Sequence, residues 1–418
     1  MTRQNFDELT AADIHEQLCN LDQLTFEITD ACNLNCKYCG YGEFYNDYDT
    51  RTNHQLNHQY AINLINYLVR LWNSNSNYSH QKVVYISFYG GEPLLNMEFI
   101  KLIVHYIESL HSKNIRFKYS ITTNGILLDK YMDFLVEQKF NILISLDGNK
   151  SNNAYRVNHN GVNSFDKIYT NAKLLERMHP DFFVHNVYFN SVLHNKNNVP
   201  ELVTFFKREF NKTPRITELN KTGIRHDKHE EFDRMYNNKY HSISGSKKEY
   251  ELPKELIFEN PKTTELNIFL HQHSENVFFS YNDLLATSGK TKKIPTGTCL
   301  PFGKKLFVTV NGKILVCERI GHQFAAGKIS ENGIELDFED IANKYNGYYE
   351  SLKSQCSKCY RLKTCTQCIF SMETKNQKLY CKHFMNKEQF NRYKNALTDY
   401  LRNNPELYTQ IMTEVTVN

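Results

Sequence analysis

Three cysteines near the start of the chain have the residue type and spacing of metal ligands. Cys32, Cys36 and Cys39 form a C-x3-C-x2-C triplet directly after a predicted strand. A structural zinc site needs four closed ligands, and the next Cys or His along the chain is His54, across a polar loop. Three thiolates in one loop instead suit a [4Fe-4S] cluster that leaves one iron open for a substrate or cosubstrate. A zinc site and a group of buried thiols are the alternatives.

Seven more cysteines lie in the last third of the chain. They are Cys299, Cys317, Cys356, Cys359, Cys365, Cys368 and Cys381. The central four follow a C-x2-C-x5-C-x2-C pattern, which alone would read as a zinc ribbon but leaves the other three unexplained. The eleventh cysteine, Cys19, lies in an amphipathic segment, and we expect it to be an inert buried thiol. An odd total at short spacings favours metal ligands over disulfides.

The elements that must position the first triplet alternate between strands and helices. Predicted strands cover 25–28, 83–88, 116–121, 141–146, 183–192 and 215–219, and helical apolar spacing lies between them. Six successive β/α units predict a parallel sheet, whose functional loops follow the carboxyl ends of the strands. Periodicity alone leaves open whether the sheet is doubly wound or a partial barrel.

The character of the sequence changes after the sixth unit. Charged, His-rich and Ser/Gly/Lys-rich stretches over 221–295 predict a connecting region with some helix. Two short β runs over 305–310 and 313–316 flank Asn311-Gly312, which predicts a hairpin. The last 30 residues are predicted to be helical.

Composition excludes several classes of protein. The chain has 418 residues and 40% hydrophobic content, enough for a sizeable core. With 50 Lys and Arg against 46 Asp and Glu, it offers little reason to expect nucleic-acid binding. The sequence contains neither an apolar run of about 18 residues nor a secretory signal, so we expect a cytoplasmic protein that does not bind membranes.

The triplet, with Tyr38 before its last cysteine, resembles the signature of the radical S-adenosylmethionine (SAM) superfamily. Further segments at strand ends are similar to that family's contacts with S-adenosylmethionine (AdoMet). They are Gly90-Gly91-Glu92-Pro93, Thr123-Asn124, Ser145 and Asp147, and Arg156. The resemblance implies a partial (β/α)6 barrel. It also implies that Cys32, Cys36 and Cys39 hold a [4Fe-4S] cluster whose open iron chelates AdoMet, and that reductive cleavage gives a 5′-deoxyadenosyl radical.

The second cysteine set resembles the seven-cysteine SPASM extension, which holds two auxiliary iron-sulfur clusters. By that pattern Cys299, Cys317 and Cys368 serve the first cluster. Cys356, Cys359, Cys365 and Cys381 serve the second, which we expect to be [4Fe-4S]. The first has only three thiolates: an open iron, a carboxylate or His ligand, or a smaller cluster are all compatible with the sequence.

The resemblance gives expected boundaries and a function. We expect an N-terminal extension over 1–22, a radical SAM barrel over 23–220, a bridging region over 221–295, a SPASM domain with a β-hairpin and helices over 296–390, and a C-terminal helix over 391–418. Enzymes of this type are most like ribosomal peptide maturases and anaerobic sulfatase-maturating enzymes. Glu318, directly after Cys317, is similarly placed to a carboxylate that those maturases use as a base.

We therefore expect modification of a ribosomally made precursor peptide: a thioether or carbon-carbon crosslink, an oxidation or an epimerisation. A flavodoxin or ferredoxin would supply the electron, and a separate protein is one candidate for leader binding, since about 22 residues precede the first strand. Sulfatase-type Ser/Cys oxidation and small-molecule radical chemistry are alternatives. A non-catalytic iron-sulfur or zinc scaffold is the alternative of another class.

Overall fold

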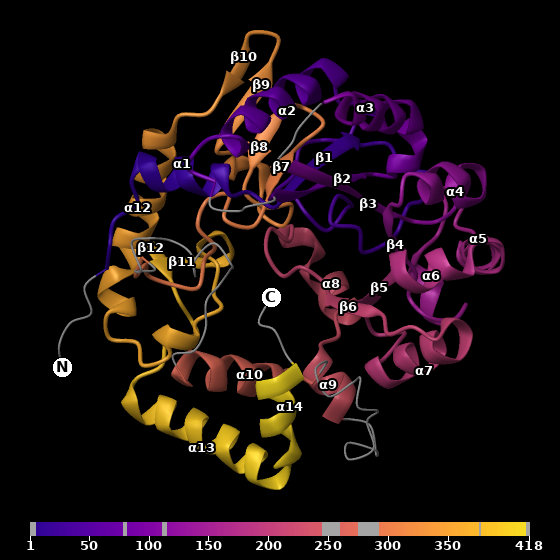
Figure 1. Cartoon of the computed structure of the whole chain (residues 1–418). Coiled ribbons are helices and arrows are strands. Elements are labelled where there is room, and N and C mark those ends of the chain that lie inside the picture. Colours follow the sequence, from indigo (N-terminus) through magenta and orange to yellow (C-terminus); the bar gives the residue numbers. More distant parts are fainter. Residues whose placement is uncertain are drawn as a thin grey trace.

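The computed structural model describes residues 6–77, 82–110, 115–244, 260–274, 292–375 and 378–414. Its main feature is a ten-stranded sheet with the order β10-β9-β8-β7-β1-β2-β3-β4-β5-β6. The strands from β7 through β1 to β6 are parallel, and β8, β9 and β10 are antiparallel. The sheet is curved, and helices cover the outside of its parallel part (Figure 1).

The parallel strands confirm the predicted α/β alternation. They are β1 Gln23–Thr29, β2 Lys82–Gly90, β3 Ile115–Thr123, β4 Asn141–Ser145, β5 Val187–Leu193 and β6 Arg215–Glu218. The predicted start of the fifth strand, at residue 183, is wrong. Pro180 instead begins the helix α6 (Pro180–Asn186), because its fixed φ and missing N–H are well tolerated in a first helical turn.

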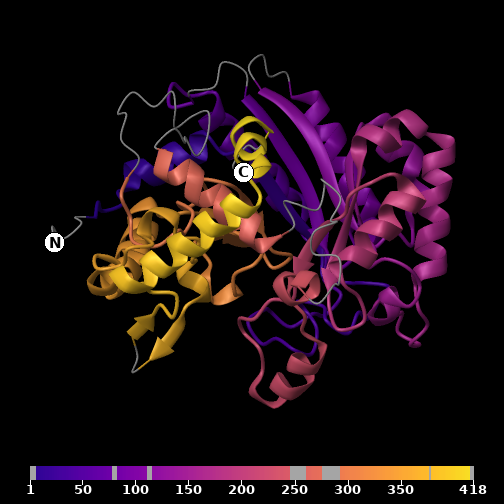
Figure 2. The same ribbon diagram turned by 90° about the horizontal axis from the view of Figure 1, so that it is seen from below.

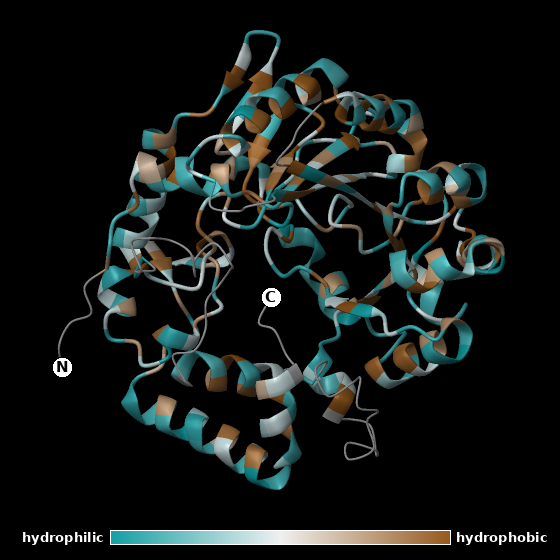
Figure 3. Cartoon of the chain, in the orientation of Figure 1, coloured by the Kyte–Doolittle hydropathy of each residue, from teal (hydrophilic) through white to brown (hydrophobic). Residues whose placement is uncertain are grey.

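Helices with one apolar face connect the strands. They are α2 His58–Trp72, α3 Met97–Ser109, α4 Leu128–Glu137, α5 Phe165–Met178 and α7 Val199–Phe210, with short 3-10 turns at Pro93–Asn96 and Asn152–Tyr155. In α2 the Asn57 side chain caps the first turn, and Ala61, Leu64 and Leu68 recur at helical spacing on the buried face. These helices carry both hydrophobic and hydrophilic residues in Figure 3, as expected for elements with one face on the core.

The later part of the chain continues the same sheet. The Asn311-Gly312 turn joins β7 (Leu306–Val308) to β8 (Lys313–Leu315), which confirms the predicted hairpin. Because β7 pairs in parallel with β1, with Phe26 opposite Val308, the hairpin extends the barrel sheet directly. β9 (Gly327–Ser330) and β10 (Gly333–Glu335) complete this edge.

The remaining elements are mostly helical. They are α1 Ala11–Cys19, α8 His229–Met235, α9 Lys239–Ser244, α10 Pro261–Ser274, α12 Phe338–Cys356, α13 Lys387–Asn403 and α14 Glu406–Glu414, 3-10 turns at His226–Lys228, His322–Phe324, Leu362–Thr364 and Ile369–Ser371, and the hairpin β11 Glu373–Lys375 with β12 Lys378–Tyr380. Helices α10, α13 and α14 pack around Leu266, Leu397, Leu407 and Ile411 and lie together in Figures 1 and 2. No described helix has the length and apolarity needed to cross a membrane.

Candidate active site

The cysteine triplet lies on the loop that leaves the carboxyl end of β1. Burial, first of all, raises the pKa of Cys32 to about 11 and that of Cys36 to about 12, and the neighbouring thiols of the triplet add to both shifts. Such thiols are poor free nucleophiles, since the thiolate is the reactive form. Among the described residues no three His, Cys, Asp or Glu side chains already converge as metal ligands. Three mutually close thiols on one loop nevertheless match the donor chemistry of an iron-sulfur cluster.

The end of β2 holds this loop through two glycines. The Gly91 N–H donates to the Thr29 carbonyl at 2.8 Å, and the Glu92 N–H donates to the Ala31 carbonyl at 2.8 Å. A Cβ on Gly91 would lie 2.0 Å from the Ala31 oxygen, and one on Gly90, whose φ is +145°, would lie 2.2 Å from the Thr29 oxygen. The glycine pair is therefore required for the close approach of this segment to the cysteine loop.

Glu92 ties the ends of β2 and β3 together. Its fully buried carboxylate accepts hydrogen bonds from the Thr123 hydroxyl at 2.6 Å, the Asn124 N–H at 2.7 Å and the Leu94 N–H at 3.0 Å. Burial outweighs these bonds and raises the pKa of Glu92 to about 7. Pro93 begins the next turn and is buried. Both carboxylate oxygens of Glu92 thus accept hydrogen bonds from within the protein.

Asn124 reaches from β3 to the cysteine loop. Its side-chain amide donates to Asn33 Oδ1 at 2.7 Å and lies 3.8 Å from Cys32 Sγ. On the other side of the loop, the Lys37 N–H donates to the Tyr155 carbonyl, and a ring nitrogen of His159 donates to the Cys32 carbonyl at 2.8 Å. The loop is therefore held from two sides, by strand ends and by the segment around Tyr155.

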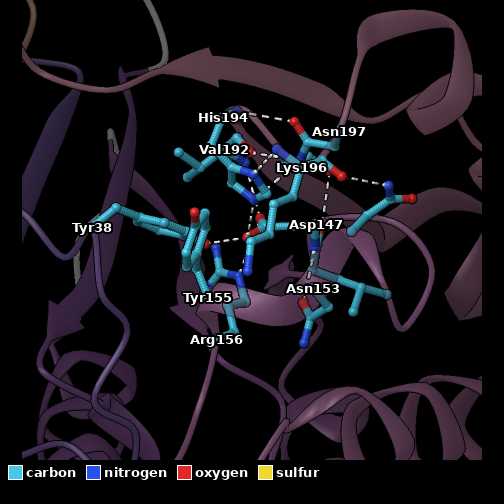
Figure 4. A network of polar contacts seen from close by, with 12 residues as sticks. Tyr38, Asp147, Asn153, Tyr155, Arg156, Val192, His194, Lys196 and Asn197 are labelled. Atoms are coloured by element: carbon cyan, nitrogen blue, oxygen red, sulfur yellow. Dashed lines mark hydrogen bonds and ion pairs between the residues drawn. The ribbon is translucent and has the colours of Figure 1, made fainter. Parts of the chain in front are cut away.

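A buried network centres on Asp147 (Figure 4). The Tyr38 hydroxyl donates to this carboxylate, Arg156 Nε lies 3.1 Å from it, and the Val192 N–H donates to it at 2.9 Å. Asp147 is 0% exposed and Arg156 is 6% exposed. Although burial opposes ionisation, Arg156 and His194 hold the pKa of Asp147 below its ordinary value.

Tyr38, Asp147 and Arg156, which were predicted separately as cofactor contacts, therefore face one another. Ser145 ends β4 opposite Asn190 of β5, apart from this network. His194 was not among the predicted site residues, yet its fully buried ring stacks on Tyr38 with centroids 5.7 Å apart. A histidine directly after the end of β5 was the available signal.

Arg51 was also missed. Its guanidinium carbon lies 4.0 Å from the centre of the Tyr41 ring, and its Nε and one Nη are buried without a hydrogen-bond partner among the described residues. Arg51 also acts electrostatically on Cys32 and on the buried Glu27. It is a cation with unused donors beside the cysteine loop.

The second cysteine set separates into two groups. Four cysteines line one pocket: Cys356, Cys359, Cys365 and Cys381. Cys299 and Cys368 lie elsewhere and are joined by Thr298, whose hydroxyl accepts the Ile369 N–H at 2.9 Å and contacts the Gln367 carbonyl at 3.5 Å. Cys317 follows β8 and packs against the cluster of Phe307, Leu315 and Ile320, as does Phe370, two residues after Cys368. The grouping of four and three agrees with the expected ligand sets, whose metal-binding role stays a prediction.

Glu318 is partly buried, with its side chain 23% exposed. Its carboxylate pairs with Lys305 at 3.0 Å and lies 3.6 Å from Cys317 Sγ. Burial opposes ionisation, yet Lys305 keeps the pKa of Glu318 below its ordinary value, so the group is a carboxylate at neutral pH. Cys19 is fully buried, with the Ser74 hydroxyl 3.5 Å away.

Residues 26–208 match the family model described as the Radical SAM superfamily. This segment, somewhat less than half of the chain, is therefore similar to radical SAM domains, in agreement with the predicted resemblance. It is 30% identical over 196 residues to the cysteine-type anaerobic sulfatase-maturating enzyme of Clostridium novyi (strain NT), covering 46% of this chain and 49% of the relative. It is 27% identical over 171 residues to the radical SAM cyclopropyl synthase TigE of Paramaledivibacter caminithermalis, covering 40% and 34%.

The chain thus spans about half the length of such curated relatives, or less. A solved structure of native anSMEcpe with bound AdoMet and the Kp18Cys peptide matches with a TM-score of 0.58 at 18% identity. That match covers 93% of this chain and 98% of the solved one. It confirms the predicted partial barrel as the fold.

Proposed function

We propose that this chain is a radical SAM enzyme that modifies a peptide or protein. The observation that carries the proposal is the loop bearing Cys32, Cys36 and Cys39, fixed at the carboxyl ends of β1, β2 and β3. When bound, the cluster supplies the electron that cleaves AdoMet reductively to methionine and a 5′-deoxyadenosyl radical. The protein binds, orients and excludes water from these partners.

We propose distinct roles for the residues around the loop. The three thiolates hold the cluster. Gly90 to Pro93, Thr123, Asn124 and Ser145 form the wall against which AdoMet binds. A second group of residues contributes to the cofactor site indirectly. Tyr38, Asp147 and Arg156 pair with one another and hold the cysteine loop in place. Arg51 has the free N–H groups that a carboxylate of AdoMet or substrate would need.

A precursor peptide is the proposed substrate. The named relatives include sulfatase-maturating enzymes and a cyclopropyl synthase, and the matching solved structure holds a peptide. The product would be a crosslink, an oxidation or an epimerisation. Flavodoxin or ferredoxin is the proposed reductant, and a separate leader-binding protein is a further proposed partner. Sulfatase-type Ser or Cys oxidation is the second candidate, favoured by the Clostridium novyi match.

Anaerobic reconstitution tests the catalytic proposal. With AdoMet and dithionite, we expect 5′-deoxyadenosine and about eleven or twelve irons per chain if three clusters form. Cys36→Ala should abolish 5′-deoxyadenosine and remove about four irons, the content of one [4Fe-4S] cluster. Cys19→Ala is the matched control, because this thiol is buried away from the site. If the wild-type chain holds iron but forms no 5′-deoxyadenosine, the catalytic proposal fails and the protein is a non-catalytic iron-sulfur scaffold.

The proposed base, Glu318, has its own test. Glu318→Gln should leave iron content and 5′-deoxyadenosine formation intact and abolish product, because the amide cannot accept the proton released after hydrogen abstraction. Candidate precursor peptides would be followed by their mass change. Glu335→Gln, which alters an exposed pair with Lys328, is the control. Unchanged product yield in Glu318→Gln would exclude the role.

A further inference from the structure

The trio Cys299, Cys317 and Cys368 comes from three separate segments near the hydrophobic cluster of Phe307, Leu315 and Ile320. Thr298, the residue before Cys299, contacts both neighbours of Cys368 through its hydroxyl. Cys317 packs in the same cluster as Phe370. Three cysteines from three separate segments are therefore brought to the same region of the protein, one ligand short of the four that a closed [4Fe-4S] cluster or zinc site takes.

Two tyrosines of α12 border this place. Tyr345 and Tyr349 are one helical turn apart, and each is 4% exposed. The Tyr345 ring lies edge-on to Phe370, with centroids 5.5 Å apart and an interplanar angle of 82°. Neither hydroxyl has a hydrogen-bond partner among the described residues. A buried tyrosine hydroxyl ordinarily has a partner, so its lack here points to a group that belongs at this position.

Tyr345 is the better placed of the two. All three thiols of the trio act electrostatically on its hydroxyl, whereas only Cys299 and Cys368 are among those that act on Tyr349. Of the two hydroxyls, that of Tyr345 is therefore the one on which all three thiols act.

Other oxygen and nitrogen ligands nearby fit less well. The Glu318 carboxylate is already paired with Lys305 at 3.0 Å. His322 has an unpartnered Nε2, but its ring lies against Tyr41 and Tyr48, and Asp49 is 3.3 Å from its other nitrogen. These contacts place His322 among Tyr41, Tyr48 and Asp49.

We propose that the Tyr345 phenolate oxygen is the fourth ligand of the iron group held by Cys299, Cys317 and Cys368. Tyrosinate is an established protein ligand of ferric iron. On binding, the O–H bond of Tyr345 is replaced by an O–Fe bond and one proton leaves to solvent, as it does from each thiol; no electron is transferred. Tyr349 lies in the outer surroundings of the group. The inference rests on the proposed auxiliary cluster, and it is independent of AdoMet cleavage.

The test uses the full chain with Cys32, Cys36 and Cys39 changed to Ala, which removes the AdoMet cluster from the spectra. After anaerobic reconstitution and metal analysis, resonance Raman excitation in the phenolate-to-iron band should give tyrosinate ring modes. Tyr345→Phe should abolish these modes and lower the iron content, while Tyr349→Phe and His322→Ala should retain them. Circular dichroism of each metal-free variant verifies folding.

Two results would overturn the inference, and they are distinguishable. If Cys299→Ala leaves the metal content of this parent unchanged, the trio holds no metal, and the proposed auxiliary cluster fails with it. If the trio holds iron but Tyr345→Phe keeps the spectrum and iron content of Tyr349→Phe, only the phenolate ligand is excluded. Loss of the ring modes in His322→Ala alone would likewise overturn it.

Discussion

At the scale of single residues, the pairing of Arg156 with Asp147 is a stability feature before it is a cofactor contact. Arg156→Ala leaves a fully buried carboxylate without its cation, which costs about 3–5 kcal/mol. We expect this loss in urea unfolding of the protein without iron or AdoMet. Arg225→Ala, which breaks an exposed pair with Asp227, should leave the midpoint unchanged. Equal midpoints for the two variants would contradict the assignment.

Glu92 gives the metal-free protein a pH dependence. Its pKa is raised from 4.5 to about 7, so the folded state binds more protons than the unfolded state between these values. The contribution of Glu92 to stability should therefore be fully present below pH 4.5 and fall by about 3 kcal/mol as pH rises to 7, at about 1.4 kcal/mol per pKa unit. Glu92→Gln should remove this contribution from the slope of unfolding free energy against pH.

Glu27 provides the comparison for that experiment. Burial raises its pKa to about 7 as well, so part of the slope should persist in Glu92→Gln and disappear only in the double variant with Glu27→Gln. An unaltered slope in the double variant would mean that neither carboxyl is protonated on folding.

The sequence predicted the residue types of the site better than their partners. A cysteine triplet is recognisable because its ligands are close along the chain. The bonds that Glu92 makes to Thr123 and Asn124 depend on the register between β2 and β3, which no local pattern encodes. His194 was missed for the same reason, since only folding brings β5 beside the cysteine loop.

At the scale of elements, the join between β2 and the cysteine loop is the most demanding position. A Cβ on Gly91 would meet the Ala31 backbone at 2.0 Å, so Gly91→Ala must displace the loop. We expect a loss of about 1–3 kcal/mol and a reduced yield of the triplet's cluster, measured as iron bound per chain. Gly347→Ala, on the exposed face of α12 with no atom within 4 Å, is the control and should be neutral or stabilising.

Element boundaries were predictable where one signal dominates. Asn311-Gly312 predicted a hairpin because this residue pair is typical of tight turns between strands, and Gly312 takes a positive φ of +78° there. The fifth strand was extended too far, to residue 183, because Phe183 and Val187 are both apolar and buried, and period alone cannot separate a short helix from a strand. The parallel pairing of β7 with β1 had no local signal.

At the scale of the whole molecule, that pairing makes the two cysteine regions parts of one sheet. A chain ending at residue 295 would expose the edge of β1, where Leu24 and Phe26 now face Leu306 and Val308. We expect this fragment to aggregate, since a bare apolar edge strand recruits other chains. A chain ending at residue 386 keeps the sheet and should remain monomeric in size-exclusion chromatography. A soluble monomeric 1–295 fragment would contradict this.

The same pairing has a consequence for the order of folding. β1 leaves the ribosome about 280 residues before its neighbour β7, since the two strands begin at Gln23 and Leu306. Contacts so distant in sequence form late and slowly, because the closure of the intervening chain must be accomplished first. During synthesis, β1 to β6 can assemble while the edge of β1 that later pairs with β7 is still unpaired. Synthesis of β7 is then the step that covers this edge of the sheet. Conditions that slow translation of the segment before β7 should prolong the dependence of the nascent protein on chaperones.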